Sequence, residues 1–179
     1  MSVYIVLEEG FEEIEALAVA DILRRAEIEC FLVSARNNDY VTGSHAITVK
    51  ADKKINEIAD CDMIVLPGGY PGYENLENND NVKNLITNAF ENNKYIAAIC
   101  AAPSILGKWG ILKGKKACCF TSFEHFLEGS TVTFDKVTHD YKIITSRGAG
   151  TAHNFAFKLV EILKSKEIAD KLEKTMLYE

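Results

Sequence analysis

An apolar run that ends in a cysteine at the start of a helix limits the folds open to this chain. Residues Tyr95–Ile99 are continuously apolar, which is typical of a strand buried on both faces of a parallel sheet. Pro103 follows closely and suits the first turn of a helix, where N–H groups have no partner within the helix. The stretch therefore predicts Cys100 at a sharp strand-to-helix turn, a nucleophile elbow. A small buried cysteine that ends a core strand fits this segment equally well.

The rest of the chain alternates short apolar runs with helical patterns, which predicts an α/β fold with a mainly parallel sheet and right-handed crossovers. Helices are predicted over Glu12–Ala26, Asn79–Asn92, Phe123–Leu127, Ala152–Lys164 and Lys166–Lys174. Strands are predicted over Val3–Leu7, Ile28–Val33, Met63–Leu66 and Lys116–Phe120, with Thr131–Val137 and Lys142–Ser146 as a hairpin or as sequential strands. Tyr40–Lys50 predicts an edge or antiparallel excursion. Without a linker or repeat, residues 1–179 are expected to form one domain.

Composition narrows the class of protein. Apolar residues make up 47% and charged residues 26% of the 179, as in ordinary globular domains. A formal net charge of −6 argues against nucleic acid as the main partner. The first apolar segment, Val3–Leu7, lacks a basic flank and is too short for a signal peptide or a membrane span. We therefore expect a cytoplasmic protein that binds neither nucleic acid nor membranes.

Five cysteines without a C-x-x-C pair favour neither a disulfide framework nor a zinc site. We expect no metal and no cofactor. Cys30 and Cys61 are expected in the core or at a strand edge. Cys118 and Cys119 are neighbours in a predicted strand, so one is expected to face inward and the other outward. A redox or metal role for this pair is the alternative.

The carboxyl ends of parallel strands are where such sheets bind ligands. Three predicted loops meet there, Glu8–Phe11, Gly68–Gly72 and Cys100–Pro103, and Arg147–Thr151 is a candidate fourth. The glycines of the second loop allow backbone N–H groups to point into a site. No G-K-[ST] follows them, so a phosphate cradle is not expected.

Glu15 is the most informative charged residue, because it lies in the middle of an apolar helix face with Phe11 and Val19. Glu13 and Arg24 are expected on the opposite face. A carboxylate on an apolar face needs a partner or is protonated, with its pKa raised by desolvation. Once protonated, it could donate a hydrogen bond to a thiolate. The alternative is that a tilted helix lets Glu15 reach water.

The histidines give a weaker signal. A Cys–His pair needs a histidine within hydrogen-bond reach of Cys100. His153 and His125 are the accessory candidates, whereas His45 and His139 are most simply surface residues. An acid partner, Glu15, is better supported than any base.

Four motifs together carry a family resemblance. They are Glu12-Glu-Ile-Glu15, Leu66-Pro-Gly-Gly69, Ala97-Ala-Ile-Cys-Ala-Ala-Pro103 and Thr145-Ser-Arg-Gly-Ala-Gly-Thr151. With these motifs in this order, the chain resembles the ThiJ/PfpI superfamily, in particular its Parkinson-disease-protein-7-like branch. The resemblance implies a flavodoxin-like three-layer α/β/α sandwich and a homodimer.

The resemblance also implies chemistry. Cys100 would be an oxidation-prone nucleophile bonded to a protonated Glu15, with backbone donors at Gly69 and Ala101 and with Gly68 as an accessory position. Activities ascribed to this branch are a glutathione-independent glyoxalase, a deglycase of methylglyoxal-modified proteins or nucleotides, and a redox-responsive chaperone.

Departures from the family pattern separate these activities. Phe120 stands where some members carry a histidine, which counts against a histidine proton shuttle. Ala101 replaces the histidine of the peptidase branch, which counts against proteolysis. His45 stands where human-type members carry an arginine. The leading hypothesis is an enzyme that acts on methylglyoxal-type dicarbonyls or their adducts. The rival hypothesis is a redox sensor or chaperone that uses a Cys100 sulfinate. The weakest is a cysteine amidohydrolase or peptidase with a Cys100–His153 pair.

Overall fold

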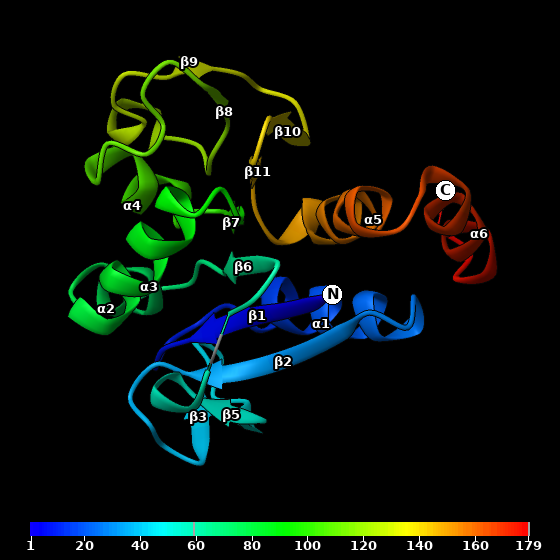
Figure 1. Ribbon diagram of the computed structural model, residues 1–179, viewed down its shortest axis with the longest axis horizontal. Coiled ribbons are helices and arrows are strands. Elements are labelled where there is room, and N and C mark those ends of the chain that lie inside the picture. Colours follow the sequence, from blue (N-terminus) through cyan, green and yellow to red (C-terminus); the bar gives the residue numbers. More distant parts are fainter. Residues whose placement is uncertain (59, 179) are drawn as a thin grey trace.

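A seven-stranded sheet forms the centre of the molecule (Figure 1), and the computed structural model describes residues 1–58 and 60–178. The strands lie in the order β10-β11-β7-β6-β1-β2-β5. Every pair is parallel except the hairpin of β10 with β11. Their bounds are β1 Ser2–Leu7, β2 Glu29–Ser34, β5 Lys53–Lys54, β6 Met63–Leu66, β7 Tyr95–Ile99, β10 Val137–Asp140 and β11 Ile143–Ser146. The predicted mainly parallel sheet is confirmed.

Helices cover both faces of this sheet. Figure 1 shows α5 and α6 on one side of it and α2, α3 and α4 on the other, and α1 packs against α5. The helices are α1 Glu13–Arg25, α2 Gly72–Glu77, α3 Asp80–Glu91, α4 Pro103–Lys108, α5 Ala152–Leu163 and α6 Lys166–Thr175, with short 3-10 turns η1 Ile55–Glu57, η2 Glu124–Phe126 and η3 Ala149–Thr151. In the described part of the chain, every helix is too short or too polar to cross a lipid bilayer.

Successive side chains of the central strands point to opposite faces of the sheet, so the interior consists of two hydrophobic cores. In β1, Ile5 packs with α1 and α5, whereas Val6 faces the core shared with α3 and α4. In β7, Ile99 and Ile96 divide in the same way. Because both faces are covered, the central strands read as unbroken apolar runs rather than alternating ones. This is the three-layer α/β/α sandwich that the motifs imply.

Two small sheets lie outside the main one. The excursion predicted over Tyr40–Lys50 is a hairpin of β3 Tyr40–Thr42 and β4 Thr48–Lys50. β8 Lys116–Ala117 pairs with β9 Thr131–Val132 in parallel. The hairpin predicted from Thr131 onward begins only at β10, so Thr131–Val132 belongs to a different sheet.

The strand predicted over Lys116–Phe120 is shorter than expected. The N–H of Cys118 donates to Thr145 Oγ1 at 2.9 Å, and that of Phe120 donates to the Cys100 carbonyl at 2.7 Å. These partners replace a strand ladder after Ala117. The prediction that one of Cys118 and Cys119 faces outward is wrong, because both are buried, with exposed fractions of 0% and 2%. Cys119 packs into the α3/α4 core.

Candidate active site

Cys100 lies directly after β7, at the turn that leads into α4. Its φ of 65° is in the left-handed region, which residues other than glycine adopt at a cost. Backbone hydrogen bonds hold this turn on both sides: the Cys100 N–H donates to the Ser146 carbonyl at 3.0 Å, and its own carbonyl accepts from Phe120. The side chain is partly exposed. The sharp strand-to-helix turn predicted at Cys100 is therefore confirmed.

Glu15 reaches this turn from the first turn of α1. Its exposed fraction is 0%, as expected from its place on the apolar face. Oε2 accepts a hydrogen bond from the Gly68 N–H at 2.8 Å, whereas Oε1 has no hydrogen-bond partner among the described residues. Burial raises the pKa of Glu15 to about 7, although the bond from Gly68 opposes the shift. A proton on Glu15 would therefore sit on Oε1.

The sulfur of Cys100 and the carboxyl of Glu15 titrate as a pair. Burial raises the pKa of the Cys100 thiol, and an ionised Glu15 beside it raises that pKa further, while the N–H groups of Ala101 and Gly69 lower it. When Glu15 is protonated, its charge no longer opposes the thiolate and its O–H can donate to the sulfur. The arrangement supports a thiolate only while the carboxyl keeps its proton.

Two glycines allow this close approach. A Cβ on Gly68 would lie 2.7 Å from the Cβ of Cys100 and 3.0 Å from Glu15 Oε2. Gly69 has a φ of 94°, and a Cβ there would lie 2.4 Å from the Glu12 nitrogen. Any larger residue at either position would displace α1 or the elbow.

The loops expected to meet at this edge do so. The Glu12 N–H donates to the Gly68 carbonyl at 2.9 Å, and the Gly72 N–H donates to the Gly10 carbonyl at 3.1 Å. The fourth loop joins through Gly148, where a Cβ would lie 3.9 Å from Cys100 Sγ. A hollow of about 310 Å³ lies there, lined by Phe120, Thr121 and residues 147–151.

Glu13 corrects one expectation. It was predicted on the exposed face of the first helix, but its exposed fraction is 4%. The tip of the β3–β4 hairpin folds over the start of α1, and the N–H and ring Nδ1 of His45 lie 2.7 and 2.8 Å from the Glu13 carboxylate oxygens. Burial acts to raise the pKa of Glu13, but the bonds from His45 outweigh it and lower that pKa. Arg24 is exposed, as predicted.

A cation site at this corner is poorly supported. Glu12, Glu13 and His45 hold ligand-type atoms within 4.8 Å of one another. Glu12 already accepts from the Glu15 N–H at 2.8 Å, where it caps α1, and both Glu13 oxygens accept bonds from the hairpin. The oxygen atoms that could bind a cation are therefore already used in hydrogen bonds within the protein.

The histidine candidates have other partners. His153 stacks on Tyr178 with ring centroids 5.4 Å apart, and His125 lies against Phe126 at 3.8 Å. Among the described residues, no histidine is hydrogen-bonded to Cys100. The apolar ring of Phe120 lies beside Gly148, which is next to the sulfur.

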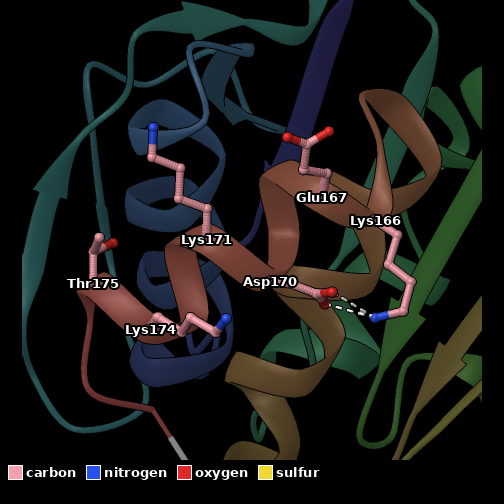
Figure 2. Close-up of a pocket in the computed structure, with 6 residues that line it drawn as sticks. All are labelled: Lys166, Glu167, Asp170, Lys171, Lys174 and Thr175. Carbon is pink, nitrogen blue, oxygen red and sulfur yellow. Dashed lines mark hydrogen bonds and ion pairs between the residues drawn. The ribbon is translucent and has the colours of Figure 1, made fainter.

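A larger hollow, of about 650 Å³, lies elsewhere (Figure 2). Its lining comes from α6 alone, including Lys166 and Asp170, which form an ion pair at 2.7 Å. It contains no thiol or histidine. Its size is therefore no guide to the chemistry at Cys100.

Comparison with known proteins places this geometry in a family. The sequence pattern of the DJ-1/PfpI family matches residues 1–162. The chain belongs to the DJ-1/PfpI family. The Toxoplasma gondii DJ-1 structure, described as oxidized, has a TM-score of 0.93 and 36% identity, covering 99% of this chain and 98% of that one.

Curated members of the DJ-1/PfpI family extend the comparison. Protein DJ-1 homolog A of Arabidopsis thaliana is 37% identical over 98% of this chain, but the chain spans only 46% of that relative. The glutathione-independent glyoxalase DJR-1.2 of Caenorhabditis elegans is 30% identical over 94% of this chain and 91% of its own length. A member of the family with a glyoxalase name therefore aligns over nearly its full length.

Arg147 was missed as a site residue. The sequence marks it only as a member of a glycine-rich loop, yet it is the one charged side chain in the motif Thr145-Ser-Arg-Gly-Ala-Gly-Thr151 of this DJ-1/PfpI family member. The structure places Arg147 in the lining of the hollow of about 310 Å³, together with Gly148.

Proposed function

We propose that this chain is a cysteine-dependent, glutathione-independent glyoxalase or deglycase that acts on methylglyoxal-type dicarbonyls or their early adducts. The observation that carries the proposal is the pairing of Cys100 with a buried Glu15 whose Oε1 has no other described partner. The resemblance to the glyoxalase-named nematode relative supports it.

In the proposed reaction, the Cys100 thiolate attacks the aldehyde carbon of methylglyoxal and forms a hemithioacetal. The N–H groups of Gly69 and Ala101 stabilise the developing oxyanion, which takes the proton from Glu15. The Glu15 carboxylate then moves a proton from the first carbon to the second, and the hydroxyl proton on the first carbon passes to the oxygen of the second, which converts the hemithioacetal into a lactoyl thioester. Water hydrolyses the thioester, so that methylglyoxal and water yield lactate and one proton and the thiol is restored.

The test is lactate formation from methylglyoxal by the wild-type chain and by Cys100→Ser. We expect the substitution to lower kcat at least 100-fold, because a hydroxyl is a far weaker nucleophile than a thiolate. Cys61→Ala is the matched control, because its thiol is buried at the opposite edge of the sheet, before β6, and its removal should leave the rate unchanged. Equal rates for the wild type and Cys100→Ser would refute the mechanism.

A second function, redox sensing through Cys100, is favoured by accessibility. Cys100 is the one cysteine that is not buried. The other four thiols, those of Cys30, Cys61, Cys118 and Cys119, are buried, so peroxide reaches them less readily than it reaches Cys100. The oxidized state named for the Toxoplasma relative supports the same idea.

Mild peroxide treatment followed by peptide mass analysis tests this function. We expect the first gain of two oxygens, a sulfinate, on the peptide that contains Cys100, and we expect Glu15→Gln to change its yield. First oxidation at another cysteine would contradict a sensor built on this site.

A further inference from the structure

Arg147 differs from the other arginines of the chain. The sequence has four, and three form ion pairs: Arg24 with Asp52, Arg25 with Asp21 and Arg36 with Glu8. Arg147 has no carboxylate partner among the described residues, although it is half-buried. A guanidinium without an anionic partner is unusual in a chain with a formal net charge of −6.

Neutral contacts hold the Arg147 guanidinium in place. Nη2 donates to Thr121 Oγ1 at 3.1 Å, and the group lies over the Phe134 ring at 6.0 Å from its centroid. Five donors in a rigid fork leave most of its hydrogen-bonding capacity unused by these contacts. The side chain is therefore positioned to receive a planar anion.

The space beside Arg147 connects it with the nucleophile. Arg147 lines the hollow of about 310 Å³, together with Phe120 and Gly148. A Cβ on Gly148 would lie 3.9 Å from Cys100 Sγ, so Gly148, which lines the hollow, is next to the sulfur. This volume is at the lower end for small-molecule sites and suits a ligand of several heavy atoms.

The other charged groups described around the sulfur are acids, or a base that is already paired with an acid. Glu12, Glu13 and Glu15 lie on the α1 side of the site, and the ring of His45 is bonded to Glu13. Arg147 therefore supplies the cation that an acidic substrate would meet on entering the hollow.

We propose that Arg147 and this hollow form a subsite for a carboxylate at the far end of the substrate. This inference rests on the proposed function and names its substrate class, short 2-oxoaldehydes that end in a carboxylate. The aldehyde carbon faces Cys100 and the carboxylate pairs with Arg147 in a bidentate bond. For 4,5-dioxopentanoate, addition of one water yields 2-hydroxyglutarate and one proton, so the aldehyde carbon is oxidised and the neighbouring ketone carbon is reduced.

The first experiment compares kcat/KM for 4,5-dioxopentanoate with that for its neutral analogue, 4,5-dioxopentanamide. We expect the wild-type chain to prefer the carboxylate about tenfold or more and Arg147→Met to lose this preference, with partial recovery in Arg147→Lys. Arg25→Met is the control, because Arg25 is ion-paired with Asp21 on the exposed side of α1 and its loss should leave the ratio unchanged. Because each ratio is measured within one variant, a change in folded fraction cancels. An equal ratio in the wild type and Arg147→Met would overturn the subsite.

The second experiment does not depend on turnover. Glutarate should slow the alkylation of Cys100 by iodoacetamide in the wild type, and Arg147→Met should lose this protection. Protection without conversion of either oxoaldehyde would refute the proposed glyoxalase and leave the carboxylate subsite standing. Absence of protection in the wild type, or equal protection in Arg147→Met, would refute the subsite even if lactate is formed from methylglyoxal.

Discussion

Glu15 is fully buried, and burial raises its pKa from 4.5 to about 7. Its Oε1 is left without a described partner, and the carboxyl group interacts with Cys100. Natural proteins rarely retain such a buried acid unless a neighbouring group uses it. Burying Glu15 therefore costs stability for the sake of the site, and this cost should be measurable as a pH dependence of the free energy of unfolding.

The change Glu15→Gln should remove that dependence. Between pH 4.5 and about 7 the folded wild-type chain keeps a proton that the unfolded chain has lost, so its free energy of unfolding falls as the pH rises through this window. The shift corresponds to about 3 kcal/mol. Urea unfolding at pH 5 and pH 8 checks this, and we expect the loss of stability at pH 8 to be smaller in Glu15→Gln. Parallel pH profiles for the two chains would show that Glu15 is ionised in the folded state throughout.

At the residue scale, helical periodicity was enough to predict the burial of Glu15. The same periodicity failed for Glu13, because its burial comes from the β3–β4 hairpin rather than from the sheet. Periodicity reports which face of a helix meets the main core and says nothing of a loop that covers the other face. His45 was likewise read as a plain surface residue, although it anchors that hairpin to α1.

At the scale of elements, α4 is fixed to the segment around η2 by close backbone contact. A Cβ on Gly107 would lie 2.0 Å from the Phe126 carbonyl oxygen and 2.9 Å from the Leu127 Cα. Since α4 begins three residues after Cys100, this contact also supports the elbow.

Gly107→Ala should therefore destabilise the chain. Alanine favours a helix by up to about 1 kcal/mol, but forcing the backbone near Phe126 apart costs about 1–3 kcal/mol. We expect a lower urea midpoint with an unchanged slope. Gly150→Ala is the matched control, because a Cβ there meets nothing within 4 Å. If both substitutions leave the midpoint unchanged, the packing of α4 on this segment is looser than described.

Element boundaries were predicted well where strands are central and poorly at the periphery. The apolar runs of β1, β6 and β7 are bounded by turns, so their ends are visible in the sequence. The strand predicted to Phe120 stops early because a threonine hydroxyl of β11 and the elbow carbonyl take its N–H groups. Such long-range partners cannot be found from local pattern.

For the whole molecule, the alternation of apolar runs and helices determined the class, and the four motifs determined the family. Neither source predicted the hollow beside Gly148, because it depends on how two loops distant in the sequence, 120–121 and 147–151, pack together. The homodimer that the resemblance implies stays a prediction, as do the catalytic roles of Cys100, Glu15, Gly69 and Ala101.

The left-handed backbone conformation at Cys100 affects which amino acid is most stable at this position. Glycine would adopt a φ of 65° without the cost of about 1 kcal/mol that a side chain incurs there. Laboratory evolution that selects for thermal stability alone should therefore replace Cys100 with glycine. The same replacement is expected in copies of the chain that are not selected for the chemistry of the thiol. Retention of the cysteine under such selection would indicate that its thiol is needed.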